Sequence, residues 1–292
     1  MNYHLCTISF RHELVSFRQL LRFACRAGFS GIELWGVHGL ALLRRPAELP
    51  ELLQEMKESG IRVAMVSDYL NLNAAVEDYA EVERKWEQLI RLAVTFGAGK
   101  IRIFAGQGSS EDATLFDWER VAGRLRGLAA RAFEVGIHTL IETHPDTYAD
   151  RLDAAVRLIG DVDYPGLGVN LDFLHLWESG TSPKEAWETL KPYVKHLHLK
   201  NVQTAEQLHV FAPGNVYSPS GERSPMVPLA SGAVEYLDVL HLLAQAKEPL
   251  DASLEWFGNG PFRYLLKEMA WLKRNGLLSE RAELSRNPAT VR

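Results

Sequence analysis

The chain has 292 residues, of which 47% are hydrophobic, and it carries a formal net charge of −5 with a pI near 6.1. This length and hydrophobic content allow a large buried core, and they suit either two small domains or one α/β barrel. No basic block is longer than the Arg44-Arg45 pair, so the sequence lacks the electrostatic footprint of a nucleic-acid-binding protein.

The N-terminus and the cysteines indicate the compartment. The first residues, MNYHLCTISF, contain no basic leader followed by a long apolar region, and no run reaches the roughly 18 apolar residues of a membrane span. Two cysteines, Cys6 and Cys25, are too few for a disulfide framework. We therefore expect a cytoplasmic protein that has no membrane or nucleic-acid partner.

Short apolar runs alternate with amphipathic stretches along the chain. The runs rich in Ile, Val, Leu or aromatic residues predict strands at 3–9, 31–35, 61–66, 100–104, 137–142, 166–172, 194–199 and 252–257. The stretches of helical period between them predict helices at 14–27, 47–59, 77–97, 117–135, 151–160, 183–191, 234–246 and 262–275. Such regular β/α alternation predicts a parallel sheet.

Eight β/α repeats without a Pro- or Gly-rich linker favour one closed (β/α)8 TIM barrel over two doubly wound domains. We expect residues 1–276 to form this single α/β domain and residues 277–292 to form a C-terminal tail. One connection, residues 201–232, is far longer than the loops of compact domains usually are. Its aromatic and proline residues favour an ordered lid.

Polar side chains lie at or near the C-terminal ends of four consecutive predicted strands, the fifth to the eighth. Glu142 ends the fifth strand, Asp172 the sixth, His198 lies in the seventh and Glu255 in the eighth. The C-terminal ends of barrel strands meet at one rim, where the chemistry of TIM barrels is found. We therefore expect the four side chains to converge there.

Three carboxylates and one imidazole, without sulfur, form a ligand set for a borderline-hard divalent ion. Separate structural salt bridges are the alternative, but they would all have to occur at the functional end of the barrel. We expect one divalent ion, with Mn²⁺ first and Mg²⁺ or Co²⁺ next, while Zn²⁺ also fits such ligands. Further candidates near this rim are His144, His175, Lys200 and Arg102. His144 could instead belong to a structural salt bridge at the strand end, His175 could serve helix packing, and Lys200 or Arg102 could pair with a ligand carboxylate.

The four donors resemble the single metal site of the xylose-isomerase-like superfamily of sugar isomerases and epimerases. Longer segments, including GIELWGVH, KIRIFAGQ, ETHPDT, NLDFLHLWESG, LHVFAPGNVY and SLEWFG, are more similar to the metal-dependent 3-dehydroshikimate dehydratases of petrobactin-type siderophore pathways. This second resemblance runs from about residue 3 to about residue 275. It implies a hydro-lyase that converts 3-dehydroshikimate to 3,4-dihydroxybenzoate (protocatechuate) and water.

The resemblance also implies roles for individual residues. The metal ligands would be Glu142, Asp172, His198 and Glu255, and the catalytic residues His144, His175 and Lys200, with the base left open between the two histidines. Arg102, ahead of Arg223 or Lys200, would bind the substrate carboxylate. The expected substrate-binding residues are Arg102, Tyr69, Tyr217, Phe211 and Phe257.

Two other classes compete with this interpretation. A metal-dependent isomerase or epimerase of a keto-sugar or inositol derivative would share the metal site, although Lys200-Asn201 follows the metal histidine where ketose 3-epimerases have Gly-Glu. A DNA-repair endonuclease on the same barrel would need further His and Asp ligands and a basic face, which the charge opposes. The sequence leaves open whether the chain forms a homo-oligomer and whether its pathway is siderophore synthesis or aromatic catabolism.

Overall fold

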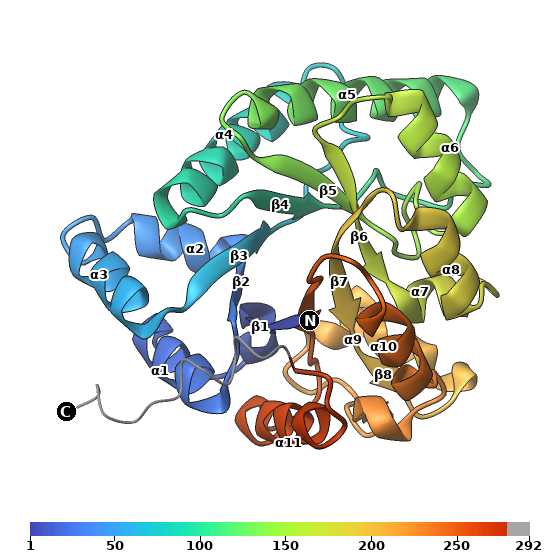
Figure 1. The fold of residues 1–292 in the computed structure, drawn as a ribbon. Helices are drawn as coiled ribbons and strands as arrows, with labels where there is room; N and C mark the ends of the chain where they lie inside the picture. Colours follow the sequence, from blue (N-terminus) through green and yellow to red (C-terminus); the bar gives the residue numbers. More distant parts are fainter. Residues whose placement is uncertain (279–292) are drawn as a thin grey trace. The chain divides into compact units, whose positions relative to one another are not determined.

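The computed structural model describes residues 1–278, in which eight parallel strands close into a barrel (Figure 1). The order around the barrel is β1-β10-β7-β6-β5-β4-β3-β2. These strands are β1 (Asn2–Cys6), β2 (Gly31–Trp35), β3 (Arg62–Ser67), β4 (Lys100–Ile103), β5 (His138–Glu142), β6 (Leu167–Asp172), β7 (Val194–Leu199) and β10 (Asp251–Leu254). The predicted (β/α)8 barrel is confirmed.

Helices follow most of the strands. They are α1 (Phe17–Ala27), α2 (Gly36–Leu43), α3 (Leu49–Ser59), α4 (Tyr79–Phe96), α5 (Leu115–Phe133), α6 (Leu152–Val162), α7 (Phe173–Glu178), α8 (Pro183–Leu190), α9 (Pro213–Val216), α10 (Tyr236–Ala244) and α11 (Pro261–Arg274). Within residues 1–278, no helix combines the length and the apolar character that a membrane span requires.

The chain divides into two compact units. The first comprises residues 1–33, 47–62 and 199–278, and the second comprises residues 34–46 and 63–198. In the first unit, α1 packs against α3 and α11. In the second, α4, α5 and α6 pack against the outer side of β4, β5 and β6, respectively (Figure 1). The single domain expected from the sequence stays a prediction.

Burial on both faces explains why the strands appear in the sequence as continuous apolar runs. All six residues of β6 are buried, because one face lines the barrel and the other meets the helices. In the second unit, the fully buried Trp86 of α4 donates its indole N–H to the carbonyl oxygen of Leu128 on α5, 3.0 Å away. This bond satisfies the polar group of a large core side chain.

Local capping fixes several helix ends close to their predicted positions. α1 begins with a capping box, in which the Ser16 hydroxyl accepts from the Gln19 amide and the Gln19 side chain accepts from the Ser16 amide. It ends at Gly28, whose φ of 84° lies in the left-handed region that glycine tolerates. α8 begins similarly, with Ser182 as its N-cap and Pro183 at its first turn.

Two predicted strand ends were wrong. The first strand ends at Cys6, because Thr7–Phe10 form a 3-10 helix, and the last ends at Leu254, so that Glu255 follows the strand instead of ending it. Two helices, α2 and α7, were not predicted. Both are short: α2 spans eight residues and contains two glycines, and α7 spans six, so neither shows a clear helical period.

The 201–232 segment contains several short elements. β8 (Asn201–Val202) pairs antiparallel with β9 (Met226–Val227). The segment also contains α9 and two 3-10 helices, Ala205–Phe211 before α9 and Leu229–Ser231 after β9. The buried Asn201 amide donates to the carbonyl oxygens of Leu229 and Val234, each at 2.9 Å. Gly232 is required here, because a Cβ would lie 2.2 Å from Asn201 Cγ. Residues 279–292 of the predicted tail lie outside the described residues.

Glu268 of α11 gives a pH-dependent prediction. It is only 2% exposed, its Oε1 accepts from the Leu229 amide at 3.3 Å, and burial raises its pKa to about 7. A raised carboxyl pKa means that the folded state favours the protonated form. The contribution of Glu268 to folding stability is therefore complete below about pH 4.5 and is lost as the pH rises toward 7. We expect Glu268→Gln to gain stability relative to wild type between pH 5 and pH 8, by about 1–3 kcal/mol at pH 8.

Urea denaturation at both pH values measures this difference. The surface variant Glu58→Gln, exposed on α3, serves as the control. An equal effect of Glu268→Gln at pH 5 and pH 8 would contradict the assignment.

Candidate metal centre and its surroundings

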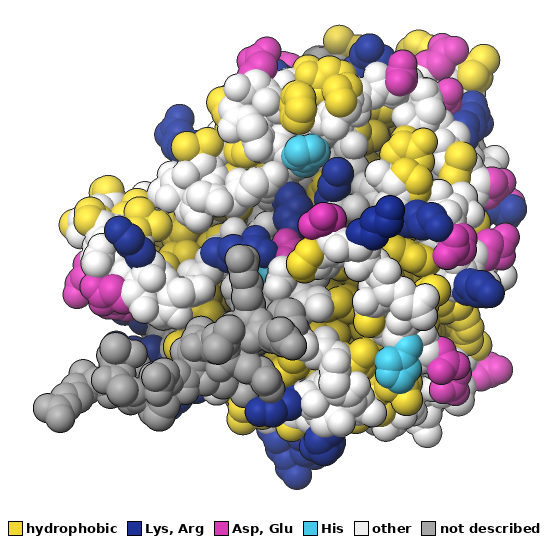
Figure 2. Space-filling view, in the orientation of Figure 1, with side chains coloured by type: hydrophobic (Ala, Val, Ile, Leu, Met, Phe, Trp, Pro, Cys, Tyr) yellow, Lys and Arg dark blue, Asp and Glu magenta, His cyan; other side chains and the backbone are white. Residues whose placement is uncertain are grey.

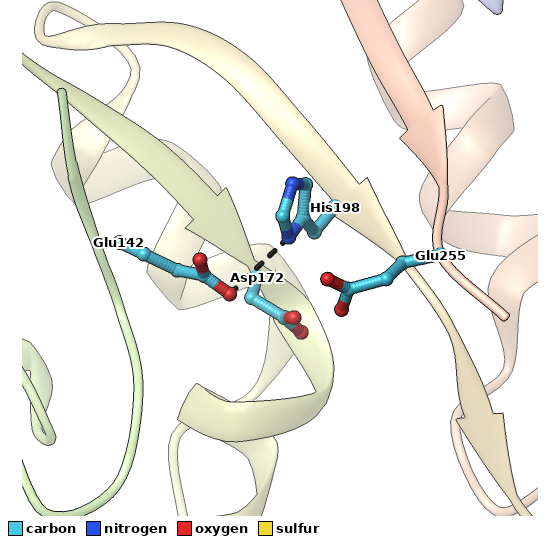
Figure 3. Close-up of side chains that lie close together, drawn as sticks. All are labelled: Glu142, Asp172, His198 and Glu255. Carbon is cyan, nitrogen blue, oxygen red and sulfur yellow. Dashed lines mark hydrogen bonds and ion pairs between the residues drawn. The ribbon is translucent and has the colours of Figure 1, made fainter. Parts of the chain in front are cut away.

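The four predicted metal ligands lie together. One donor atom from each of Glu142, Asp172, His198 and Glu255 lies within 4.8 Å of the donors of the other three. The side chains point toward one another, as Figure 3 shows, and none is more than 3% exposed. Small side-chain movements would bring all four donors onto a single cation.

Strand register and local hydrogen bonds position these ligands. Asp172 lies opposite His198 in the β6–β7 pair, and Glu142 is the last residue of β5. The Thr143 hydroxyl donates to the Asp172 carbonyl at 3.2 Å and accepts from the Asp172 amide at 2.9 Å, which ties the ends of β5 and β6 together. The Glu255 amide donates to the Leu199 carbonyl at 3.1 Å.

The donor set fits a divalent cation. Three buried carboxylates and one imidazole without sulfur suit Mn²⁺, Mg²⁺ or Co²⁺. Buried carboxylates at such distances repel one another unless positive charge is present among them. His198 Nδ1 and Glu142 Oε1 are 3.2 Å apart, a spacing typical of two adjacent ligands of one ion. These residues therefore could hold the predicted metal.

Two buried cations pair with two of the candidate ligands. Arg102 Nε lies 3.0 Å from Glu142 Oε2, and Lys200 Nζ lies 2.5 Å from Glu255 Oε2. Arg102 and Lys200 are 1% and 3% exposed, so solvent screens these pairs little. The structural ion pairs considered from the sequence thus exist, beside a cluster that still has one more carboxylate than cations.

Aromatic rings line the second unit near Arg102. Its guanidinium lies 5.0 Å from the centre of the Tyr69 ring and 5.4 Å from that of Phe104. Tyr69 is held by its neighbours, because Asp68 Oδ1 accepts from the Tyr69 amide at 2.7 Å and Lys85 donates to both Asp68 Oδ1 and the Tyr69 carbonyl. The sequence interpretation did not select Phe104 or Lys85.

The two candidate histidines lie side by side. The ring centres of His144 and His175 are 4.3 Å apart, and the ring centres of Phe104 and His144 are also 4.3 Å apart. His175 Nε2 is 3.8 Å from Asp172 Oδ2, whereas its Nδ1 is 3.1 Å from Glu178 Oε2. Glu178 was missed in the sequence, although its position three residues after His175 places both on one helical face.

The remaining predicted substrate residues belong to the first unit. Lys200 Nζ lies 5.7 Å from the centre of the Phe211 ring and 5.5 Å from that of Phe257, and the two rings are 6.3 Å apart. Phe211 and Phe257 are buried, whereas Tyr217 is 40% exposed. The structure thus brings Lys200, Phe211 and Phe257 together and leaves Tyr217 the least enclosed of the five predicted substrate residues.

The surface bears charges of both signs. On the face that Figure 2 shows, acidic side chains lie among the basic ones, with hydrophobic side chains between them. This mixture differs from the continuous basic stripe that marks many nucleic-acid-binding faces.

Arg102 also gives a stability prediction. Removing one partner of a buried ion pair leaves an uncompensated charge. We therefore expect Arg102→Met to lower the unfolding free energy of the metal-free protein by about 3–5 kcal/mol. Chemical denaturation in the presence of EDTA measures this change. The control is Arg84→Met on α4, whose ion pair with Glu81 is exposed and should matter much less. A loss no larger than that of the control would mean that the Arg102–Glu142 pair is dispensable.

A parallel barrel with a buried three-carboxylate, one-imidazole cluster at the ends of its strands defines the class of this protein. The chain belongs to the xylose isomerase-like TIM barrel family, whose model matches residues 21–275. The superfamily resemblance predicted from the sequence is confirmed.

Three comparisons describe its relatives more closely. The chain is 41% identical to a 3-dehydroshikimate dehydratase of Bacillus anthracis over 278 residues, which cover 95% of this chain and 98% of that protein. The crystal structure of AsbF from Bacillus anthracis, a probable 3-DHS dehydratase involved in petrobactin synthesis, matches with a TM-score of 0.90 and 41% identity over 94% of this chain and 99% of that one. An inosose dehydratase of Lacticaseibacillus casei is 28% identical over 210 residues, 67% of each chain.

Proposed function

We propose that the protein is a 3-dehydroshikimate dehydratase that forms 3,4-dihydroxybenzoate and water. Similarity to the Bacillus anthracis enzyme over nearly the full length of both chains supports this function over a sugar isomerase or epimerase. Within the structure, the observation that carries it is the pair of adjacent imidazoles, His144 and His175, beside a buried candidate metal cluster. Dehydration next to a ketone needs both a base and charge stabilisation.

The reaction requires removal of a proton from the carbon next to the substrate ketone. Negative charge then develops on the ketone oxygen, and its return expels the hydroxyl group on the β-carbon as water. Glu142, Asp172, His198 and Glu255 would hold a divalent ion, for which we propose Mn²⁺, and the bound ion would supply Lewis-acid stabilisation of that charge. Enolisation, which moves a proton from the ring CH₂ group to the ketone oxygen, completes the aromatic ring.

His144 has the geometry of the base. Its Nδ1 lies 2.7 Å from the carbonyl oxygen of Pro145, and because a carbonyl only accepts, Nδ1 carries the hydrogen of the neutral ring. The lone pair of that tautomer is then on Nε2. Phe104 and His175 pack against the ring and restrict its orientation. We assign proton abstraction to Nε2 of His144.

The other polar residues have complementary roles in this proposal. His175 protonates the departing hydroxyl group, with Glu178 accepting a hydrogen bond from its Nδ1. Lys200 stabilises the developing oxyanion, and Arg102 provides a counter-charge for the substrate carboxylate in addition to its pair with Glu142. Tyr69, Phe211, Tyr217 and Phe257 form the surrounding walls.

The local charge favours an acidic substrate over a neutral sugar. The three candidate carboxylates face two buried cations, Arg102 and Lys200, so a bound divalent ion leaves one net positive charge. A substrate with a single carboxylate neutralises it, which is favourable in a site screened little by water. The carboxylate of 3-dehydroshikimate meets this requirement.

A direct assay tests the function. Metal-loaded protein is mixed with 3-dehydroshikimate, and the ultraviolet absorbance of the catechol product is followed. We expect product formation with 3-dehydroshikimate and none with ketohexoses or inosose. Turnover of a ketose or inosose without turnover of 3-dehydroshikimate would overturn the proposal.

The setting of the enzyme follows from the same proposal. The relation to a petrobactin-pathway protein supports a role in siderophore synthesis, for which 3,4-dihydroxybenzoate would be the product supplied. A small-molecule substrate, a cytoplasmic location and the single-domain organisation complete the proposal.

A further inference from the structure

Arg11 connects three segments of the first unit that are far apart in the sequence. It follows the 3-10 helix after β1, and its Nε donates to the Val216 carbonyl at 2.7 Å. Its Nη2 donates to the Phe257 carbonyl at 2.9 Å, and its Nη1 to the Ile8 carbonyl at 3.4 Å. The planar guanidinium thus reaches the 201–232 segment and the segment after β10 at the same time.

One of these contacts leads to Lys200. The guanidinium carbon of Arg11 lies 4.9 Å from the centre of the Phe257 ring, and Lys200 Nζ lies 5.5 Å from the same centre. Lys200 also lies 5.7 Å from the centre of Phe211, in the 201–232 segment. The position of Phe257, fixed through its carbonyl and its ring by Arg11, therefore shapes the surroundings of Lys200.

The other contact leads to the end of α9. The Val216 carbonyl accepts from Arg11 and, at 3.1 Å, from Arg223 Nη2, while His12 Nε2 is 3.3 Å away. Carbonyls at a helix C-terminus have no partner within the helix, so donors from elsewhere satisfy them. Arg223 belongs to the 201–232 segment itself, whereas Arg11 ties that segment to the end of β1.

We propose that Arg11 is a positioning residue that holds residues 212–218 and Phe257 around Lys200 and thereby sets the affinity for the substrate. This inference rests on the proposed function, because it assumes that Lys200 and its aromatic neighbours contact the substrate. A lysine at position 11 would keep the charge but not the fork that binds several carbonyl oxygens together. Arg11 itself does not carry out chemistry in this proposal.

The test compares Arg11→Met and Arg11→Lys with Arg22→Met, which changes an exposed arginine of α1. Hydrogen exchange is measured on metal-loaded protein at the amides of Asn215–Ser218, which donate within the turn of α9. We expect these amides to exchange faster in both Arg11 variants and at the wild-type rate in the control. We also expect KM for 3-dehydroshikimate to rise about 10–100-fold, with a smaller change in kcat and unchanged affinity for Mn²⁺.

The outcomes separate this inference from the function on which it rests. Wild-type exchange and KM in both Arg11 variants would overturn it, and so would faster exchange without a rise in KM. Full rescue by Arg11→Lys would show that charge alone matters and would overturn the role of the fork. If wild-type protein fails to convert 3-dehydroshikimate, the proposed function is wrong, and the exchange data still decide whether Arg11 holds the 212–218 residues.

Discussion

Exhaustive chelation is expected to abolish conversion of 3-dehydroshikimate, and added Mn²⁺, Co²⁺ or Mg²⁺ is expected to restore it. The four converging donors motivate this prediction, because they leave a buried excess of negative charge that a divalent ion neutralises. Loss of the Lewis acid should slow turnover at least about 10²–10³-fold. Catechol absorbance after chelation and after titration with each ion measures the effect. Full activity in metal-free protein would exclude a metal role.

Asp172 allows a sharper version of the same experiment. Its Oδ1 accepts from the Leu174 amide at 3.0 Å, so it both caps α7 and offers a metal donor. Asp172→Asn keeps the capping oxygen and loses the charge, whereas Asp172→Ala loses both. We expect both variants to lose metal binding and activity.

The two Asp172 variants should differ in stability. In the presence of chelator, Asp172→Ala should be about 1 kcal/mol less stable than Asp172→Asn, because the alanine variant lacks the oxygen that caps α7. Calorimetric titration with Mn²⁺ and chemical denaturation separate the two effects. Wild-type Mn²⁺ affinity in Asp172→Asn would remove this carboxylate from the metal site.

His144→Asn is expected to lower the rate about 10²–10⁴-fold while metal and substrate binding are retained, because it removes the proposed base. It should equally suppress exchange of the substrate α-proton with deuterium from solvent. His241→Asn, which changes an exposed histidine of α10, provides the matched control. Single-turnover kinetics and mass spectrometry of the substrate measure the two effects.

Exchange and product formation distinguish the two histidines. If His144→Asn exchanges the α-proton at the normal rate but releases no product, His144 acts as an acid in the later step. The base is then His175, whose ring lies 4.3 Å away. Equal loss of both processes in His144→Asn, with exchange retained in His175→Asn, supports the proposed assignment.

The barrel was predictable from the sequence because its strands are buried on both faces and its helices are amphipathic. Runs such as Leu167–Asp172 therefore appeared as continuous apolar segments, and Gly28 marked the end of α1. α7 escaped prediction because six residues are less than two turns. The 3-10 helix at Thr7–Phe10 escaped because its apolar residues continue the pattern of β1.

The candidate metal ligands were predictable for a different reason. Parallel strands place their last residues at one rim, so the strand ends alone indicated Glu142, Asp172, His198 and Glu255. The groups around them depend on contacts between distant residues. Arg11 meets Val216 across 205 positions and Phe257 across 246, and no local pattern encodes such contacts.

The ion pairs of Arg102 and Lys200 have a consequence for the life of the metal-free protein. Each cation already binds one of the carboxylates, Glu142 or Glu255, so part of the charge of the cluster is compensated within the chain itself. Small zinc domains, in contrast, unfold without their ion. We therefore expect the polypeptide to fold before any ion binds, and one metal-free preparation to accept each ion in turn.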